Sequence, residues 1–459
     1  MISYGSCQFP TLGFVVDRYL KVQSFVPEPF WAIKLSHLKD GITVNFLWDR
    51  TRLFDRSMVT ILYERCLGAK YAEVKKVTTK QTKKWKPLPL TTVELQKAAS
   101  RWLRMNSQAA MKAAESLYNK GFISYPRTET DVFDKGMDLK GLCAKHVQHE
   151  QWGEFARGLG DGGFSWPRQG RHDDKAHPPI HPVIPYGGDR HSEEGRMYEF
   201  ITRRFLACCS KDALGVQTNI SLAYGPESFH TSGLTILERN YLDVYPYDKW
   251  TGTLLPQFGE GEKFEPKECR ISAGETSSPG YLTEPDLLAL MDANGIGTDA
   301  TMAEHIAKIQ ERGYAMTRPR GTGGNTAAPD APTTRGRGRG RGSRAARGGR
   351  GGSRGGGANA SSGSAGMEEF IPTNLGVALM EGYDKVGFEE NLSKPFLRKE
   401  LEIRLKQVCE GTKTKEEVVR EELAQYKRVF RQTEEKIEVL RGACRRYIFA
   451  PLGQQGGAR

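Results

Sequence analysis

The sequence predicts a multi-domain protein of mixed α and β structure, in which a helical domain interrupts a β-rich one. Strand-forming segments at 31–46 and 218–237 lie on either side of helical patterns that run from 90 to 208. A second helical part follows from residue 283. The chain of 459 residues is long enough for several packed units.

The charge of the chain is uneven. It has 67 Lys and Arg against 55 Asp and Glu, a net charge of +12. Eight arginines and no acid occur between 331 and 366, so this segment supplies +8 of the total. Such a balance is typical of proteins that bind polyanions. The eight cysteines contain no C-x-x-C pair, which favours reduced thiols over a zinc site. We find no apolar run of about 20 residues and no signal peptide, so we expect a protein of the cytosol or nucleus that does not enter a membrane.

The β-rich part begins with segments 31–35 and 42–46, which flank the hairpin signal Asp40-Gly41. Before them, residues 6–22 predict a loop that leads into a short helix. Strands are expected again at 218–223 and 233–237, on either side of Gly225-Pro226. Residues 70–86 carry seven lysines and one acid. They fit either a solvated strand edge or, as the second interpretation, a rim that faces nucleic acid.

The helical insert begins after Leu90, where Thr91 and Glu94 have the spacing of a capping box. A second helix is expected from about Ser107, and it ends at Gly121. Its predicted face contains Met111, Ala114 and Tyr118. The region 130–190 is loop-rich, and another helix follows near 193–208.

In the last part, Thr283 is expected to cap a helix with Leu287, Leu288 and Met291 facing inward. The turn 294–297 leads to a second helix, capped by Thr298 or Asp299, with Met302, Ile306 and Ile309 on one face. A short strand at 314–317 completes a pattern that resembles a winged helix-turn-helix. The Arg-Gly segment falls where the hairpin of the wing would turn, and we expect a disordered loop there, at 318–367.

The segment Gly121-Phe-Ile-Ser-Tyr125-Pro-Arg127-Thr-Glu129 carries the sharpest chemical signal. Pro126 favours an extended Tyr125, which places Tyr125 and Arg127 on one side of the chain. A guanidinium lowers the pKa of a nearby phenol and binds phosphate with two parallel donors. One hypothesis is therefore a tyrosine that attacks a phosphodiester while Arg127 holds the phosphate. The alternative, which local chemistry alone favours, is a tyrosine packed on its helix with Arg127 paired to Glu129.

Three further segments could contact phosphate. The prolines of Asp173-Asp-Lys-Ala-His177-Pro-Pro-Ile-His181-Pro hold two histidines in a loop, where a histidinium could stabilise negative charge. A metal site at His177 and His181 is a hypothesis without an evident third ligand. The residues around Gln8 (5–13) and those of turn 295–301 precede helices, whose N-termini attract phosphate. An ordinary capped helix explains both equally well.

Taken together, ISYGSCQFPTLGF, GFISYPRTET, AHPPIHP and GIGTDAT, in this order, resemble type IA DNA topoisomerases. RNYLDVYPYDKW and FLACCS are more similar to the alpha than to the beta form of eukaryotic topoisomerase III. The resemblance implies a protein that cuts one DNA strand through a tyrosine linked to a 5′-phosphate, passes another strand and reseals the break. It assigns Tyr125 as nucleophile, Arg127 as phosphate anchor and His177 as a further phosphate contact. Gln8, Thr298 and Asp299 match segments that line the single-strand groove.

The resemblance also implies a domain division. The nucleophile domain would span 86–211, and the β-rich arch would combine 20–85 with 212–281. Residues 1–19 would pack with 282–459 as the helical DNA-binding domain. Arg335, Arg337, Arg339 and Arg341 in the Arg-Gly segment are expected to add contacts to nucleic acid.

Family members also have a Toprim domain with the acidic ligands for Mg²⁺, and no segment here resembles it. The sequence therefore predicts a type IA core without Toprim, whose isolated chain binds a strand but relaxes DNA weakly or not at all. The implied partners are single-stranded DNA, with RNA as a second candidate, a RecQ-type helicase and an OB-fold protein, in the nucleus. The rival functions are a non-catalytic DNA- or RNA-binding protein and a scaffold of a helicase complex.

Overall fold

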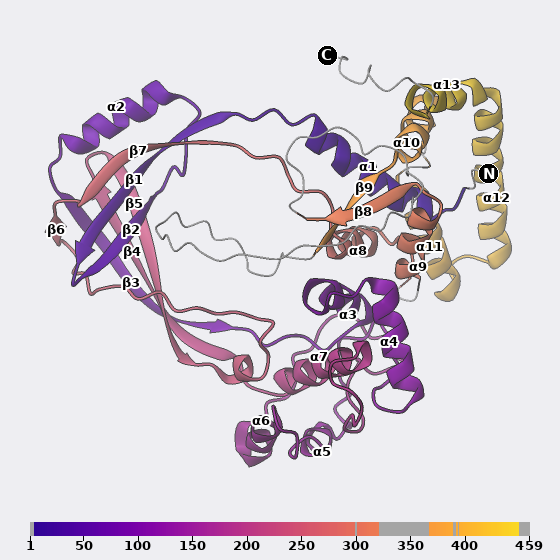
Figure 1. Cartoon of the computed structure of the whole chain (residues 1–459), viewed down its shortest axis with the longest axis horizontal. Coiled ribbons are helices and arrows are strands. Elements are labelled where there is room, and N and C mark those ends of the chain that lie inside the picture. Colours follow the sequence, from indigo (N-terminus) through magenta and orange to yellow (C-terminus); the bar gives the residue numbers. More distant parts are fainter. Residues whose placement is uncertain (1–3, 299–300, 321–366, 389–391, 393, 449–459) are drawn as a thin grey trace, which may run out of the picture.

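The computed structural model describes residues 4–298, 301–320, 367–388, 392 and 394–448. One curved antiparallel sheet and two helical bodies lie at the corners of a triangle (Figure 1). Each of the three has its own cluster of buried apolar side chains. The predicted mixture of α and β structure is confirmed. Among the described helices, none combines the length and apolarity needed to cross a membrane.

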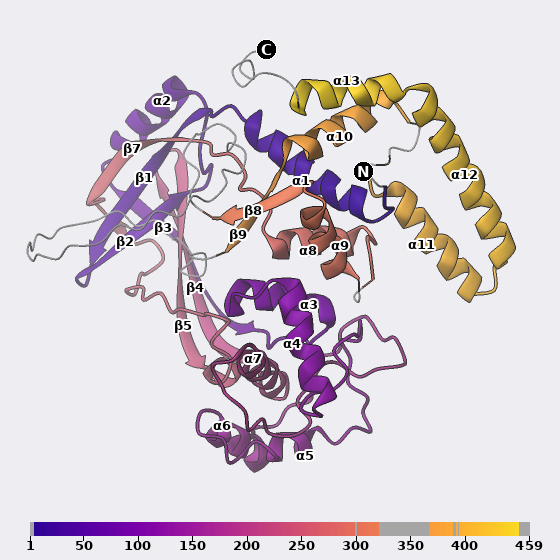
Figure 2. The same cartoon turned by 45° about the vertical axis from the view of Figure 1, so that its right-hand side comes forward.

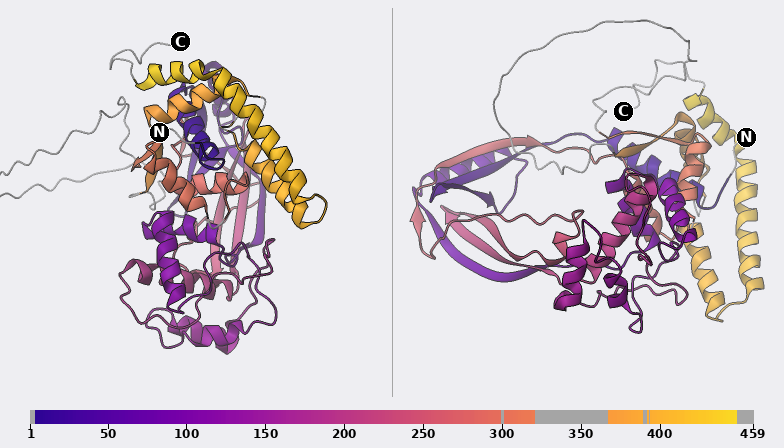
Figure 3. Two further views of the ribbon diagram at one scale, coloured as in Figure 1. Left: turned by 90° about the vertical axis from the view of Figure 1, so that its right-hand side faces the viewer. Right: turned by 60° about the horizontal axis from the view of Figure 1, so that its bottom comes forward.

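The large sheet has seven strands in the order β6-β3-β4-β5-β2-β1-β7, and every pairing is antiparallel. The strands are β1 (Pro29–Lys39), β2 (Ile42–Trp48), β3 (Ala72–Lys84), β4 (Ala213–Tyr224), β5 (Glu227–Glu238), β6 (Lys263–Phe264) and β7 (Glu268–Glu275). Helix α2 (Arg56–Leu67) packs beside β1 and β7. The long strands β3, β4 and β5 of this sheet extend toward the helical body formed by residues 92–208 (Figure 3).

Both expected hairpins are present. The β1–β2 turn places Asp40 and Gly41 at φ of 51° and 76°, a region that glycine adopts without a steric penalty. Gly225, at φ 60°, turns β4 into β5. The lysine-rich segment forms β3, whose outer neighbour β6 has only two residues, so most of β3 is an exposed edge. This confirms the expectation of a solvated strand, and the nucleic-acid rim remains a prediction.

The first helical body contains α3 (Thr92–Ala98), α4 (Ser107–Asn119), α5 (Leu139–Ala144), α6 (Gly153–Gly158) and α7 (Glu193–Cys208). The Thr91 hydroxyl accepts from the Glu94 N–H, at 3.4 Å, and so caps α3. The Glu94 carboxylate binds Lys97 Nζ at 2.5 Å instead of completing the predicted capping box. Met111 and Ala114 are buried, whereas Tyr118 on the predicted face is 42% exposed.

The second helical body contains α1 (Gln8–Gln23), α8 (Glu284–Ala293), α9 (Met302–Glu311), β8 (Ala315–Pro319), β9 (Glu368–Pro372), α10 (Asn374–Val386), α11 (Phe396–Cys409), α12 (Lys415–Glu435) and α13 (Ile437–Ile448). The prediction of a loop and a short helix at 6–22 was wrong, because α1 has 16 residues and begins at Gln8. Pro10 lies in the first turn, where its missing N–H breaks no helical hydrogen bond. Phe9 and Leu12 are fully buried and hold α1 in the core.

Helices α8 and α9 and the β8–β9 hairpin form the expected helix-turn-helix with a wing. Thr283 and Asp286 form a capping box at α8, and Gly295 and Gly297 make the turn at φ of 63° and 83°. The prediction for the second cap was wrong: α9 starts at Met302, so Thr298 belongs to the turn. Asp299 lies outside the described residues, as do Arg335, Arg337, Arg339 and Arg341 between the paired strands.

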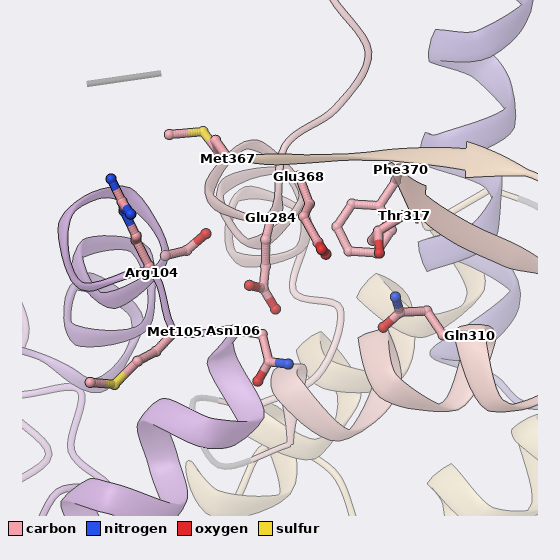
Figure 4. A pocket seen from close by; sticks show the side chains of 10 residues that line it. Arg104, Met105, Asn106, Glu284, Gln310, Thr317, Met367, Glu368 and Phe370 are labelled. Atoms are coloured by element: carbon pink, nitrogen blue, oxygen red, sulfur yellow. The ribbon is translucent and has the colours of Figure 1, made fainter. Parts of the chain in front are cut away.

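The two helical bodies touch where α3 and the start of α4 meet α8 (Figure 2). Val93 belongs to the apolar cluster of the second body. Glu284 is 9% exposed and accepts from the N–H of Ser107 at 3.0 Å and from its hydroxyl at 2.6 Å. Figure 4 shows Glu284 directed at Asn106 in a pocket of about 220 Å³ between the bodies. The domain boundaries given above remain a prediction.

Candidate active site

Tyr125 lies where two distant sequence motifs pair. Gly121, at φ 78°, ends α4 and directs the chain into the loop 122–130. Ile123 forms an isolated β-bridge with Pro182, and the Ser124 N–H donates to His181 O at 2.9 Å. The GFISYPRTET and AHPPIHP segments therefore form one structural unit, although 57 residues separate Ser124 from His181.

The Tyr125 ring is half-buried between two other rings. Its centroid lies 4.7 Å from that of His177, with an interplanar angle of 34°. On the α4 side it meets Tyr118 at 5.3 Å, edge to face. The structure thus places His177 beside the tyrosine with which the sequence analysis associated it. Tyr118 was assigned to a helix face there, and its contact with Tyr125 was missed.

Arg127 forms an ion pair that the sequence analysis did not name. Its Nε and Nη2 donate to Glu115 Oε1 at 2.8 Å and 2.5 Å. Glu115 precedes Tyr118 by three residues, so both side chains lie on the same side of α4. Hydrogen bonding to Glu115 raises the pKa of Arg127, so the guanidinium keeps its charge beside Tyr125. The i, i+3 spacing of Glu115 and Tyr118 near the end of the helix could have predicted that both side chains face the Tyr125 segment.

Asp174 positions His177. Its Oδ1 accepts from the N–H groups of Ala176 and His177, each at 2.8 Å, and its Oδ2 lies 3.4 Å from His177 Nδ1. Burial acts to raise the pKa of Asp174, but the hydrogen bonds outweigh it and lower the pKa to about 2. The Asp174 carboxylate is therefore ionised at neutral pH and favours a proton on Nδ1 of His177. Nε2 of this exposed ring is then the nitrogen that faces away from Asp174.

His181 serves a different purpose from His177. It is 4% exposed, and its Nδ1 lies 2.7 Å from Pro179 O. Burial lowers the pKa of His181, which keeps the ring neutral. It packs against Phe133 at 5.8 Å between ring centroids. The structure therefore makes His181 a support for the loop, and the hypothesis that it shares a metal with His177 is not favoured.

Two cavities lie between the first helical body and the predicted groove residues, and one of them is also lined by the Tyr125 loop. Gln8 accepts from Arg312 Nη1 at 2.5 Å and lines a cavity of about 290 Å³ with Gln108 of α4 and Glu304 of α9. Glu304 also contributes to the raised pKa of Arg127. Thr298 lines a second cavity, of about 660 Å³, opposite Thr128. Gln8 and Thr298 thus both face the first helical body.

A metal ion does not fit the donors that the structure brings together. No group of three or more His, Cys, Asp or Glu side chains in the described part of the chain could hold one. Beside Tyr125, Glu115 is engaged by Arg127, and Asp174 by two N–H groups. The Mg²⁺ implied by the sequence resemblance therefore has no ligand set among the described residues.

Comparisons with known proteins give matches to one family. A model of the DNA topoisomerase family matches residues 1–322. DNA topoisomerase 3 of Schizosaccharomyces pombe is 43% identical over 453 residues, which cover 98% of this chain and 66% of that protein. DNA topoisomerase 3-alpha of Homo sapiens is 43% identical over 449 residues, covering 98% of this chain and 40% of that protein. The chain spans less than two thirds of the length of either relative.

The fold has a counterpart among solved structures. Full-length topoisomerase I from Thermotoga maritima is similar with a TM-score of 0.65 and 22% sequence identity. The match covers 94% of this chain and 64% of that one. It confirms the fold that the sequence resemblance implied.

Proposed function

The chain belongs to the DNA topoisomerase family, and from this premise we propose that it cuts and reseals one DNA strand through Tyr125. The phenol oxygen attacks a backbone phosphorus, forms a bond to the 5′-phosphate and displaces the 3′-oxygen, which leaves as a hydroxyl with the proton of the phenol. One phosphoester replaces another, so the step needs no ATP, and the reverse attack reseals the strand. The proposal is carried by the position of Tyr125, half-buried against His177 and two residues from Arg127.

Two side chains would assist the phenol. The Arg127 guanidinium presents parallel donors that suit a phosphate and stabilises the charge that develops on it. In its imidazolium form, His177 would donate from Nε2 to a non-bridging oxygen, because Asp174 occupies its Nδ1 side. Glu115 competes with the phosphate for Arg127, so nucleic acid must displace or share that carboxylate. Gln8, Thr298, Asp299 and the arginines at 335, 337, 339 and 341 would bind the strand on either side.

The sequence resemblance supports the following proposals for substrate and partners. Single-stranded DNA is the proposed substrate, and RNA is the second candidate. A RecQ-type helicase and an OB-fold protein are the proposed partners, with the nucleus as location and Mg²⁺ as the proposed cofactor. Family membership makes a purely non-catalytic binding protein or scaffold the less favoured function.

The test is the covalent intermediate. A 3′-end-labelled single-stranded oligonucleotide is incubated with Mg²⁺ and the purified chain, alone and with a Toprim domain of a topoisomerase 3 relative added, and the protein is then denatured. Labelled protein is expected in at least one arm and should vanish in Tyr125→Phe. Tyr71→Phe, which alters an exposed tyrosine next to β3, should retain it.

Labelled Tyr125→Phe protein would assign the nucleophile to another residue. A wild-type chain that stays unlabelled in both arms would reject the cutting activity.

A further inference from the structure

An exposed tryptophan lies where β3 enters the first helical body. Trp85 directly follows β3 and is 60% exposed, which is unusual for so large an apolar side chain. The guanidinium carbon of Arg168 lies 5.3 Å from the centroid of its ring. Lys83 is also exposed, and its position two residues before Trp85 on an extended chain places both side chains on the same side. An aromatic face and two cations therefore lie together.

This arrangement is held rigidly. Lys86 is 3% exposed, and its Nζ donates to the carbonyl oxygens of Ser210 and Trp166 at 2.6 Å and 2.8 Å. Arg168 Nη1 in turn donates to Lys86 O at 2.9 Å. The loop that carries Arg168 is thus fastened to the residue after Trp85. A ligand that stacks on the indole would bind without ordering this loop first.

The two cations are not neutralised internally. Within the described ranges, no carboxylate forms an ion pair with Arg168 or Lys83, whereas neighbouring Lys84 pairs with Asp248 at 2.5 Å. We propose that Trp85, Arg168 and Lys83 form a stacking platform for single-stranded nucleic acid, separate from the cutting site. An unpaired base would stack on the indole, and the two cations would contact the adjacent phosphates.

The position of the platform favours a nucleic-acid ligand. Arg168 also lines the cavity of about 660 Å³ that contains Thr128 and Thr298, so the platform continues from the Tyr125 loop. The same cavity is lined by five carboxylates, which repel phosphate: Glu94, Glu129, Asp131, Asp292 and Glu402. A strand is therefore expected to follow the Arg168 edge. The choice of ligand rests on the proposed function, but the binding site does not depend on strand cutting.

The test measures binding separately from cutting. The Tyr125→Phe chain of 459 residues is titrated into fluorescein-labelled oligothymidylate of about 16 nucleotides, and the fluorescence anisotropy is read. Trp85→Ala is expected to weaken binding about tenfold, and Trp85→Phe less, because stacking of one base on an aromatic ring is commonly worth that much. The control is Tyr71→Ala. Tyr71 is 48% exposed, with Lys70 Nζ 5.3 Å from its ring centroid, at the other end of β3.

A second variant covers the case in which Trp85→Ala does not fold. Lys83→Gln should reduce the slope of log affinity against log salt by about 0.7, the value for one phosphate contact on a single strand. Equal affinities for the Trp85 and Tyr71 variants, or an unchanged salt slope for Lys83→Gln, would overturn the platform and leave this surface to a protein partner. Neither result depends on the covalent adduct, so loss of the platform and loss of the cutting activity are distinguishable.

Discussion

Glu115→Gln should increase the affinity for single-stranded DNA, because Glu115 competes with phosphate for Arg127. The two hydrogen bonds from Arg127 to Glu115 measure 2.8 Å and 2.5 Å. Buried charge-assisted bonds contribute about 1.5–3 kcal/mol, whereas exposed ion pairs contribute about 1 kcal/mol or less. The Arg127 and Glu115 side chains are 29% and 40% exposed, so the lower figure applies. Removing a competing interaction of about 1 kcal/mol should lower the Kd for single-stranded DNA about fivefold.

The assay is fluorescence anisotropy with labelled oligothymidylate in the Tyr125→Phe background, where no covalent bond can form. Glu154→Gln is the matched control, because Glu154 lies exposed on α6 and is outside the ion pairs of the described residues. The charge change is the same in both variants, so a general gain in electrostatic attraction appears in each. Should Glu115→Gln bind no more tightly than Glu154→Gln, then Glu115 orients Arg127 instead of competing for it.

Two further predictions concern the scaffold. In urea unfolding, Gly225→Ala should lower the free energy of unfolding by about 1–3 kcal/mol more than Gly41→Ala does. Both glycines have a positive φ, but a Cβ on Gly225 would lie 2.7 Å from Arg65 O, whereas a Cβ on Gly41 would meet no atom within 4 Å. Equal losses would show that the β4–β5 turn moves away from α2. Burial raises the pKa of Glu284 at the contact between the two helical bodies. Protonated Glu284 therefore stabilises this contact, fully below a pH of about 4.3, and the stabilisation is lost as the pH rises through the raised pKa. Hydrogen exchange of the Ser107 amide, corrected for its intrinsic pH dependence, should therefore show less protection as pH rises, and Glu284→Gln should abolish that trend; protection that grows with pH would contradict the assignment.

The two hairpin turns of the curved sheet could be predicted from the neighbouring residues alone. Asp40-Gly41 and Gly225-Pro226 are turns because their backbone conformations depend on a few neighbouring atoms, and both hairpins could be predicted. Helix α1 was predicted too short, because the mixture of Gly, Pro and aliphatic residues at 6–22 was taken to begin with a loop. Burial of Phe9 and Leu12 against distant parts of the chain decides that helix.

The sequence by itself determined the chemistry of the candidate site: a tyrosine and an arginine two residues apart, with Pro126 between them, and a histidine in a proline-rich loop. Only the tertiary structure decided which groups surround them. Glu115, Tyr118 and Asp174 became site residues when α4 and the 173–182 loop packed against the Tyr125 segment. The physical reason is range: backbone preference acts over a few residues, whereas an ion pair or a ring contact depends on how segments far apart in the chain fold onto one another.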